Sequence, residues 1–222
     1  MKELKEKRFF FFDLDGVILN SMPYHAKAWI EVFSEFNLKF TEQEIYLYEG
    51  AIEFETVESL FKRKGLLKIT PQDFEKILQI QKTLFKKKYA KLVKPFPEVL
   101  EILENLKREG KKLALVTSSH KEILSEVLPK NIKNFFEVII TGDRVAKRKP
   151  HPDPYLKAKE AFQAIDSESL AIENAPAGIL SAKRAHLFCI GLTTTLPKKY
   201  LSLADLIVEN HLQLRSLLLD GR

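Results

Sequence analysis

The sequence predicts an α/β fold in which a parallel β-sheet carries helices on both faces and is interrupted after its first strand by an all-helical insert. Three observations lead to this prediction. Short apolar runs alternate with amphipathic segments from about residue 93 onward, as expected for parallel strands joined by helices. Residues 20–90 show a helical pattern and no convincing strand. A run of four phenylalanines, residues 9–12, precedes that segment and supplies the first strand.

Composition is that of a globular protein with a full core. The chain has 222 residues, of which 45% are hydrophobic, enough for one large domain or for a core with a smaller insert. The formal net charge of +6 favours an anionic partner, and phosphate esters meet this condition as well as nucleic acid does. Acidic residues are interspersed among short basic clusters, so we expect a small-molecule partner and neither nucleic-acid nor membrane binding.

Cysteine usage and the length of the apolar runs bear on the cellular compartment. The single cysteine, Cys189, excludes an internal disulfide and lies in an apolar run, which predicts a buried thiol in a reducing environment. No run approaches the roughly 18 apolar residues of a membrane span. The four apolar residues at 9–12 follow a basic stretch but are too few for a secretory signal. We therefore expect a cytoplasmic protein.

The first strand runs into two carboxylates. Side chains alternate along a strand, so Asp13 and Asp15 share one face while Leu14 points to the other. Two acids this close repel each other and require a cation, a shared proton or nearby hydrogen-bond donors. The pair suits a nucleophilic Asp beside an acid/base carboxylate at a metal ion. The alternative is a strand that ends in a solvated acidic turn.

Three helices are expected in the insert. The second covers Glu53–Lys64 and ends near Gly65, and the third begins after the N-cap Thr70 and runs to about Tyr89. The first has an apolar face with spacings of three and four, formed by Ala26, Trp29, Ile30, Phe33 and Phe36.

These helices define a predicted domain division. We assign residues 1–17 and 93–222 to the core and 18–92 to a helical cap. Hinges at Val17–Ser21 and Lys91–Pro97 would let the cap close over a site and expel water. The alternative is a fixed helical subdomain without hinge motion.

Beyond the cap, helices and strands are expected to alternate. The expected helices are Glu98–Glu109, Lys121–Leu128, Pro154–Ala164, Pro176–Ala185 and one at the C-terminus. The expected strands are Lys112–Val116, Glu137–Ile140, Leu170–Ile172, Phe188–Gly191 and Leu206–Glu209.

Polar residues follow these strands at the edge where open α/β sheets bind ligands. Thr117 ends one strand, and its hydroxyl, with the backbone N–H groups of Ser118 and Ser119, is suited to hold phosphate oxygens. The same residues would also serve as an ordinary helix cap.

Further polar residues follow the later strands. Lys149 would offset negative charge in an acidic site, while Arg148 is expected to be a surface neighbour. Glu173 and Asn174 could complete an octahedral Mg²⁺ site with their oxygen atoms. Asn174 would equally serve as an N-cap for the next helix.

Four stretches of the chain, residues 9–21, 113–120, 147–155 and 170–185, together resemble the four motifs of the haloacid dehalogenase-like hydrolase superfamily. The helical insert resembles the cap of its β-phosphoglucomutase and phosphoglycolate phosphatase-like subfamily. The resemblance implies a Rossmann-like core and phosphoryl-transfer chemistry. It also favours Lys149 over Lys147 as the lysine of the third motif.

The resemblance implies a role for each matched residue. Asp13 would attack phosphorus to form an aspartyl-phosphate, and Asp15 would protonate the leaving oxygen and then activate water. Thr117 and Lys149 would hold the transferring group. The implied substrate-binding residues are Gly16, His25, Ser118 and Ser119, and the implied Mg²⁺ ligands are Asp13, Asp15, Asn174 and Glu173. The family commonly has Asp at the position of Asn174, so this chain lacks one negative charge there.

The cap sequence bears on the reaction. His25 resembles a residue at the start of the β-phosphoglucomutase cap, whereas Trp29 fits the apolar stripe of the core. Glu53 stands where a mutase would place an arginine for a second phosphate, and Lys82 would replace that arginine only in part. We therefore favour hydrolysis of a small phosphate monoester, of sugar phosphate or phosphoglycolate type, over mutase chemistry.

The sequence also bears on three other functions. A dehalogenase would not need Asp15, and a phospho-accepting regulatory domain would have its Asp after the third strand, where this chain has Thr141. A catalytically weakened phosphate-binding homologue remains an alternative because of Asn174. We expect a monomer or a weak dimer.

Overall fold

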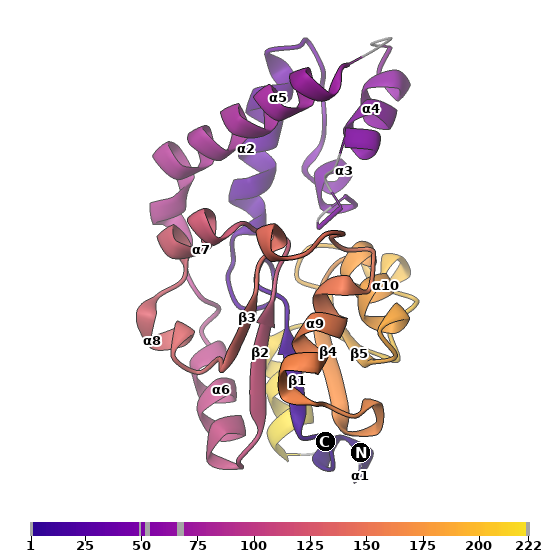
Figure 1. The fold of residues 1–222 in the computed structure, drawn as a ribbon. Coiled ribbons are helices and arrows are strands. Elements are labelled where there is room, and N and C mark those ends of the chain that lie inside the picture. Colours follow the sequence, from indigo (N-terminus) through magenta and orange to yellow (C-terminus); the bar gives the residue numbers. More distant parts are fainter. Residues whose placement is uncertain (1, 49, 52–53, 66–68, 221–222) are drawn as a thin grey trace.

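The computed structural model describes residues 2–48, 50–51, 54–65 and 69–220. Its core is a six-stranded parallel sheet with the strand order β3-β2-β1-β4-β5-β6 (Figure 1). The strands are β1 Phe9–Phe12, β2 Lys112–Val116, β3 Val138–Ile140, β4 Ser169–Glu173, β5 Phe188–Leu192 and β6 Leu206–Val208. This order reverses direction at β1, which places the crevice of an open α/β sheet next to the end of that strand. The predicted α/β fold class is confirmed.

The four phenylalanines of β1 explain why this strand lies at the centre of the sheet. All four are buried, and their side chains alternate between two hydrophobic clusters. Phe10 and Phe12 join one cluster, which includes side chains of α6 and α11, whereas Phe9 and Phe11 join the other, with α9 and α10. A strand that buries both faces can be continuously apolar, as this one is.

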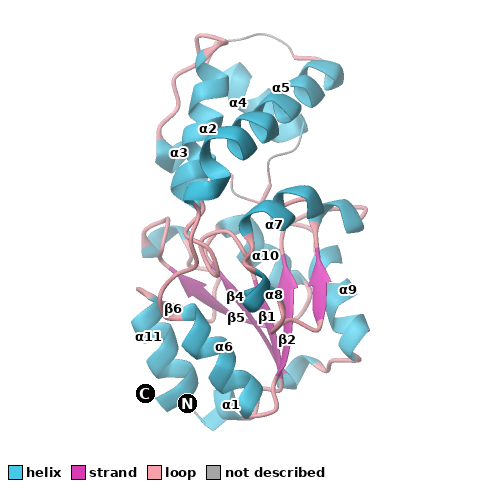
Figure 2. Cartoon of the chain, turned by 90° about the vertical axis from the view of Figure 1, so that its left-hand side faces the viewer, coloured by secondary structure: helices cyan, strands magenta, loops and turns pink. Residues whose placement is uncertain are grey.

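Helices cover both faces of the sheet (Figure 2). A short N-terminal helix, α1, precedes the sheet, and a π-helical turn ends the described chain. The helices of the core are α1 Lys2–Lys5, α6 Val99–Arg108, α7 Lys121–Val127, α8 Lys130–Lys133, α9 Asp153–Phe162, α10 Pro176–Arg184 and α11 His211–Arg215.

The insert between β1 and β2 forms a separate group of helices over the carboxyl ends of the strands (Figures 1 and 2). It has its own hydrophobic cluster, to which Trp29, Phe33 and Phe61 contribute. Its helices are α2 Met22–Ser34, α3 Glu42–Tyr46, α4 Phe54–Arg63 and α5 Pro71–Leu84, which continues as a π-helical turn over Phe85–Tyr89.

Several predicted elements need adjustment. The five-residue α3 was missed, although Thr41 and Glu44 form the capping box that marks a helix start. Phe36 lies beyond the end of α2 and is 37% exposed, so it does not belong to the buried face of that helix. Strand β4 extends to Glu173, one residue beyond its predicted end. The predicted start of the second helix, Glu53, lies outside the described residues.

Candidate active site

A buried lysine organises the floor of the site. Lys149 is 2% exposed, and its ammonium donates to Asp13 Oδ1 at 2.6 Å, to Glu173 Oε1 at 2.7 Å and to the Val116 carbonyl at 2.9 Å. An ammonium has three protons, so these bonds use its full donor capacity. The ends of β1, β2 and β4 thus meet at one atom, the Nζ of Lys149.

The electrostatics of this cluster favour a charged lysine and a proton on Asp13. Burial raises the pKa of Asp13 to about 8; Lys149 opposes the rise, while Glu173 and Asp15 add to it. Burial alone would lower the pKa of Lys149, but Asp13 and Glu173 outweigh burial and raise it above its usual value. Without a further cation, Asp13 is therefore largely protonated at neutral pH.

Two residues that the sequence did not indicate fix the carboxylate of Glu173. The hydroxyl of Tyr155, a fully buried residue of α9, donates a short hydrogen bond to Glu173 Oε1. Gly178 in α10 lies against the same carboxylate, and a Cβ there would stand 2.0 Å from Glu173 Oε2. Only glycine lets the helix approach this closely.

Asp15 is held by three side chains, of which His25 comes from a helix of the insert. Ser21 Oγ donates to its Oδ1 at 2.6 Å and Ser119 Oγ to its Oδ2 at 2.8 Å. His25 Nε2 of α2 lies 3.3 Å from Oδ1, and its ring stacks on Phe85 with centroids 3.9 Å apart. Burial would raise the pKa of Asp15, but His25 and the two hydroxyls outweigh it and lower the pKa to about 2. The two neighbouring acids therefore differ widely in proton affinity.

The loop after β2 is ordered by its own hydrogen bonds. Ser119 N–H donates to Thr117 Oγ1 at 3.0 Å. This backbone donor is therefore engaged within the loop, whereas the sequence predicted that it would bind an anion. Ser118 Oγ donates to the Gly50 carbonyl of the insert at 3.0 Å. This bond and the contact between His25 and Asp15 join the insert to the core at the site.

Asn174 lies against Gly16 and is not among the residues that line the pocket. Its side chain is fully buried, and its amide nitrogen donates to Thr195 Oγ1 at 3.1 Å. Gly16 has a positive φ of 86°, and a Cβ on it would stand 2.1 Å from Asn174 Nδ2. Gly16 therefore makes room for Asn174, and neither residue lines the pocket.

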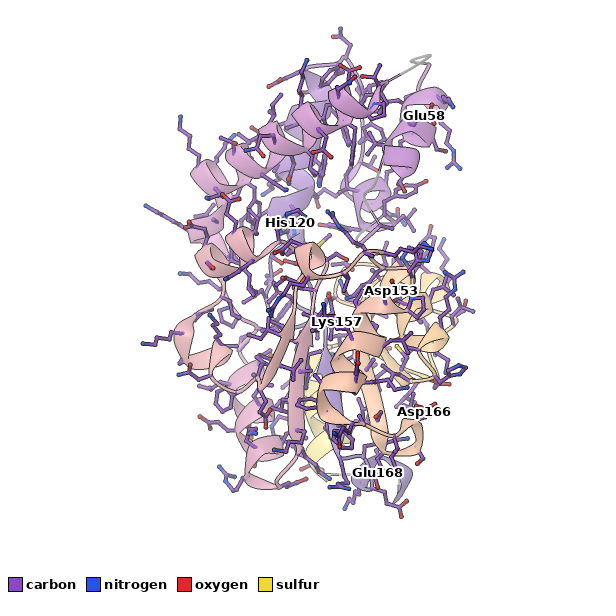
Figure 3. The ribbon with its side chains drawn as sticks, in the orientation of Figure 1. Glu58, His120, Asp153, Lys157, Asp166 and Glu168 are labelled. Carbon is purple, nitrogen blue, oxygen red and sulfur yellow. The ribbon has the colours of Figure 1, made fainter. Side chains whose placement is uncertain are left out.

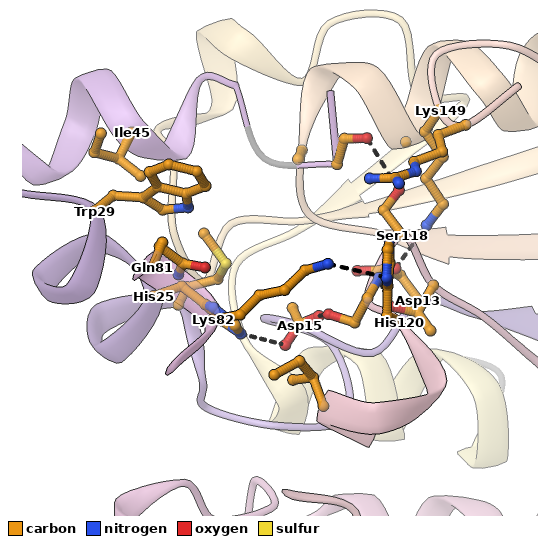
Figure 4. Close-up of a pocket in the computed structure, with 18 of the residues that line it drawn as sticks. Asp13, Asp15, His25, Trp29, Ile45, Gln81, Lys82, Ser118, His120 and Lys149 are labelled. Carbon is orange, nitrogen blue, oxygen red and sulfur yellow. Dashed lines mark hydrogen bonds and ion pairs between the residues drawn. The ribbon is translucent and has the colours of Figure 1, made fainter. Parts of the chain in front are cut away.

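The other predicted site residues do line one pocket between the insert and the core (Figure 4). Arg148 also lines it and is half-buried, so its predicted place as a surface neighbour is wrong. His120 and Lys82 complete the polar wall. The predicted site residues brought together here are Asp13, Asp15, His25, Thr117, Ser118, Ser119, Lys149 and Glu173.

The oxygen donors that follow β1 and β4 are of the kind that fits Mg²⁺, although they do not form a cage of acidic ligands. Among the described residues, no group of three or more His, Cys, Asp or Glu side chains is arranged to hold a metal ion. Glu173 Oε1 is already bonded to Lys149 and Tyr155. Mg²⁺, however, needs only one or two carboxylates, with water and substrate phosphate completing its shell. Asp13, the Asp15 carbonyl and the Asn174 amide are hard oxygen donors of the kind it prefers.

Comparison with known proteins decides the family. The sequence profile of haloacid dehalogenase-like hydrolases matches residues 10–192. The chain belongs to this family. A validoxylamine A 7'-phosphate phosphatase from Streptomyces hygroscopicus subsp. limoneus is 26% identical over 205 residues, 92% of this chain and 94% of the relative. A β-phosphoglucomutase from Bacillus subtilis is 29% identical over 203 residues, 89% of this chain and 87% of the relative.

Solved structures agree with this assignment. A candidate β-phosphoglucomutase from Bacteroides vulgatus has a TM-score of 0.84 and 26% identity over 97% of this chain and 95% of that one. The predicted enzyme class, a haloacid dehalogenase-like phosphoric monoester hydrolase, is confirmed by the family and its phosphatase members. In the described part of the chain, no helix has the length and apolar character to cross a membrane.

The close contact at Gly178 generates a prediction. In the Gly178→Ala variant, the new methyl group collides with Glu173 and displaces the partner that orients Lys149. We expect phosphatase kcat to fall by about a hundredfold, the scale of a displacement of about 1 Å at a reacting group. Circular dichroism checks that the variant is folded. A folded variant with the kcat of the original protein would contradict the role of this contact.

The pKa of Asp13 generates a second prediction, for protein kept free of divalent cations with EDTA. The folded-state pKa of about 8 exceeds the ordinary value of 3.8, so the contribution of Asp13 to stability is complete below 3.8 and is lost as pH rises through 8. The Asp13→Asn variant lacks this titration. Its free energy of unfolding, relative to that of the original protein, should therefore rise between about pH 5 and about pH 9. A difference that does not vary with pH would exclude the raised pKa.

Proposed function

We propose that this protein is a Mg²⁺-dependent phosphatase that hydrolyses a small phosphate monoester, of sugar phosphate or phosphoglycolate type, through a phosphorylated Asp13. One observation carries the proposal: Lys149 fixes Asp13 Oδ1 at the floor of a pocket into which a second, ionised carboxylate also projects. An anchored nucleophile beside an acid/base group is the arrangement that covalent catalysis requires.

In the first step, Oδ2 of Asp13 attacks phosphorus after Asp13 has lost its proton to solvent, a loss that the positive charge of bound Mg²⁺ would favour. The Asp13–phosphorus bond forms, the ester bond breaks, and the leaving oxygen takes a proton from Asp15. Because the pKa of Asp15 is about 2 in the substrate-free protein, only a small fraction carries this proton at neutral pH. A phosphate dianion in the pocket raises the pKa of the neighbouring carboxyl and so favours the protonated form.

In the second step, Asp15 acts as the base. It removes a proton from water, the resulting oxygen attacks phosphorus, and the bond to Asp13 breaks to release inorganic phosphate. Ser21, Ser119 and His25 hold the Asp15 carboxylate in place between the two steps. Thr117 would hold the transferring group by a hydrogen bond during both steps, and Lys149, whose three protons are already donated, would attract it through its positive charge.

Mg²⁺, when bound, would be held by Asp13, the backbone carbonyl of Asp15 and Asn174, and would neutralise the charge that two carboxylates and a phosphate bring together. The neutral amide of Asn174 contributes less attraction for the ion than a carboxylate would. We therefore infer weaker Mg²⁺ binding than an Asp at this position would give.

The relatives support a phosphate monoester as substrate, because one is a phosphatase and another a phosphosugar mutase. Glu53, the residue that favours hydrolysis over mutase chemistry, lies outside the described residues. Mutase activity is therefore tested separately, as isomerisation of glucose 1-phosphate.

The central test of this function is the Asp13→Asn variant. It keeps the shape of the side chain but removes the nucleophile, so Mg²⁺-dependent phosphate release from p-nitrophenyl phosphate and a sugar-phosphate panel should fall about a thousandfold or more. Asp220→Asn, at an exposed position in the last described turn, is the matched control and should retain full activity. Appreciable turnover by Asp13→Asn would refute the nucleophilic role.

The amide at position 174 offers a separate test of metal binding. Asn174→Asp adds a carboxylate at a fully buried position, so the metal-free variant should be less stable than the original protein. The same charge should tighten Mg²⁺ binding about tenfold or more. Thermal unfolding across a Mg²⁺ titration measures both effects. If Mg²⁺ stabilises the two proteins equally, Asn174 is not a ligand.

A further inference from the structure

The turn that follows β1 and carries Asp15 is closed by its own backbone. The N–H groups of Ile18 and Leu19 both donate to the Leu14 carbonyl at 2.9 Å. In the opposite direction, Gly16 N–H donates to the Leu19 carbonyl at 2.8 Å. Asp15 lies inside this set of bonds, so a movement of the turn also moves the Asp15 carboxylate.

Two carbonyls of this turn accept hydrogen bonds from side chains near the other end of the chain. Thr194 Oγ1 donates to the Gly16 carbonyl at 2.6 Å. His211 Nε2 lies 2.7 Å from the Val17 carbonyl, and because a carbonyl can only accept, the ring proton lies on Nε2. Both donors lie beyond residues 10–192, the stretch that the family profile matches. Neither belongs to the four motif stretches identified in the sequence.

His211 also contacts the chain segment that leads back from the insert to the core. Its ring stacks on Phe96, with the ring centroids 4.0 Å apart. Phe96 N–H in turn donates to the Ile18 carbonyl at 3.1 Å. The next residue, Leu19, pairs with Pro95 in an antiparallel bridge. One side chain therefore touches both of the segments that connect the insert with the core.

The surroundings of His211 show which property of histidine matters there. The residue is 4% exposed and begins α11, on the face of the sheet that α6 also covers (Figure 2). It lies beside a small cavity with apolar side chains such as Phe12 and Leu214. Burial lowers the pKa of His211, against the opposing effects of the Val17 bond and of Glu98, so the ring is neutral at neutral pH. An apolar ring would fill this space at a lower desolvation cost, so the hydrogen-bond donor is what histidine adds.

Asp13 is held independently of this turn. Its N–H donates to the Ile172 carbonyl of β4 at 3.0 Å, and its carboxylate accepts from Lys149. A loosened turn would therefore shift Asp15 relative to Asp13, whose position in the sheet would not change. The expected consequence is a defect in proton transfer and not in nucleophilic attack.

We propose that His211 is a positioning residue for Asp15: its bond to the Val17 carbonyl, supported by Thr194, holds the turn so that the Asp15 carboxyl meets the leaving oxygen. This inference rests on the proposed function, in which Asp15 donates a proton to that oxygen. His211 does not line the pocket, so it acts through the backbone of the turn. Its contact with Phe96 holds the same turn against the returning segment.

Leaving groups of different acidity test this proposal. p-Nitrophenolate is a stable anion that leaves without a proton, whereas the alkoxide of a sugar phosphate needs one. The His211→Phe variant keeps a ring but removes the donor. Its kcat/KM for the best sugar phosphate of the panel should fall about tenfold, the scale of one lost hydrogen bond, while kcat/KM for p-nitrophenyl phosphate should change little.

Two further variants separate the donor from the ring and from the loss of a histidine in general. His211→Gln supplies an amide N–H without a ring and should recover most of the lost rate. His186→Phe is the matched control, because His186 is exposed and precedes β5 at the amino-terminal edge of the sheet. Asp166 and Glu168 mark that edge in Figure 3, and His120 marks the opposite edge, next to the insert. The control should leave both kcat/KM values unchanged.

Thr194→Val provides the same test if His211→Phe does not fold. It removes the bond to the Gly16 carbonyl but keeps the shape of the side chain, so a selective loss on the sugar phosphate is again expected. An equal loss on both substrates would mean that these bonds only stabilise the fold, and it would overturn the proposal. Full activity on both substrates would overturn it as well.

Hydrogen exchange separates this inference from the proposed function, because it requires no activity. The amides of Ile18 and Leu19 should exchange about tenfold faster in His211→Phe than in the original protein or in His211→Gln. If no ester is hydrolysed, the phosphatase proposal fails, but faster exchange would still support the hold of His211 on the turn. Unchanged exchange would refute that hold, and faster exchange without the selective loss of activity would refute the positioning of Asp15.

Discussion

The ammonium of Lys149, bonded to both Asp13 and Glu173, is the interaction on which the site depends. Breaking a buried ion pair by removing one partner costs about 3–5 kcal/mol, because the remaining charge stays buried. Each element around the cluster supports it: β4 supplies Glu173, α9 supplies Tyr155, and α10 approaches closely at Gly178. The surrounding fold therefore holds the proposed nucleophile and its counter-charge at fixed positions before substrate arrives, which is how electrostatic preorganisation accelerates a reaction.

The helical insert contacts the residues of the site as well as covering them. His25 contacts Asp15, and the Gly50 carbonyl accepts from Ser118, so both sides of the pocket must meet for Asp15, the proposed acid/base group, to be held as described. The two acids have opposite pKa shifts. Burial raises the pKa of Asp13, whereas at Asp15 the hydrogen-bond donors and His25 outweigh burial and lower the pKa. Asp15 has donors from the insert and the core, whereas Asp13 shares its lysine with a second carboxylate.

The sequence predicted the residues that lie at strand ends and missed those that act through packing. Strand alternation and motif spacing led to Asp13 and Lys149, because their positions depend on local patterns. Tyr155 and Gly178 could not be found this way, since their importance arises from contact with Glu173 that only folding creates. Helix α3 could have been found, because its capping box is a local signal. Arg148 was misplaced because no sequence pattern shows which residues of a basic loop face inward.

Phosphorylation of Asp13 itself tests the central claim most directly. The protein is mixed with substrate and Mg²⁺, quenched in acid within milliseconds and reduced with borohydride, which converts an acyl phosphate to a stable alcohol. Peptide mass spectrometry then locates the reduced residue. We predict homoserine at position 13 in the original protein and unmodified Asp15 in the same peptide. A phosphoryl group on another residue, or product formation with no labelled residue, would contradict the account.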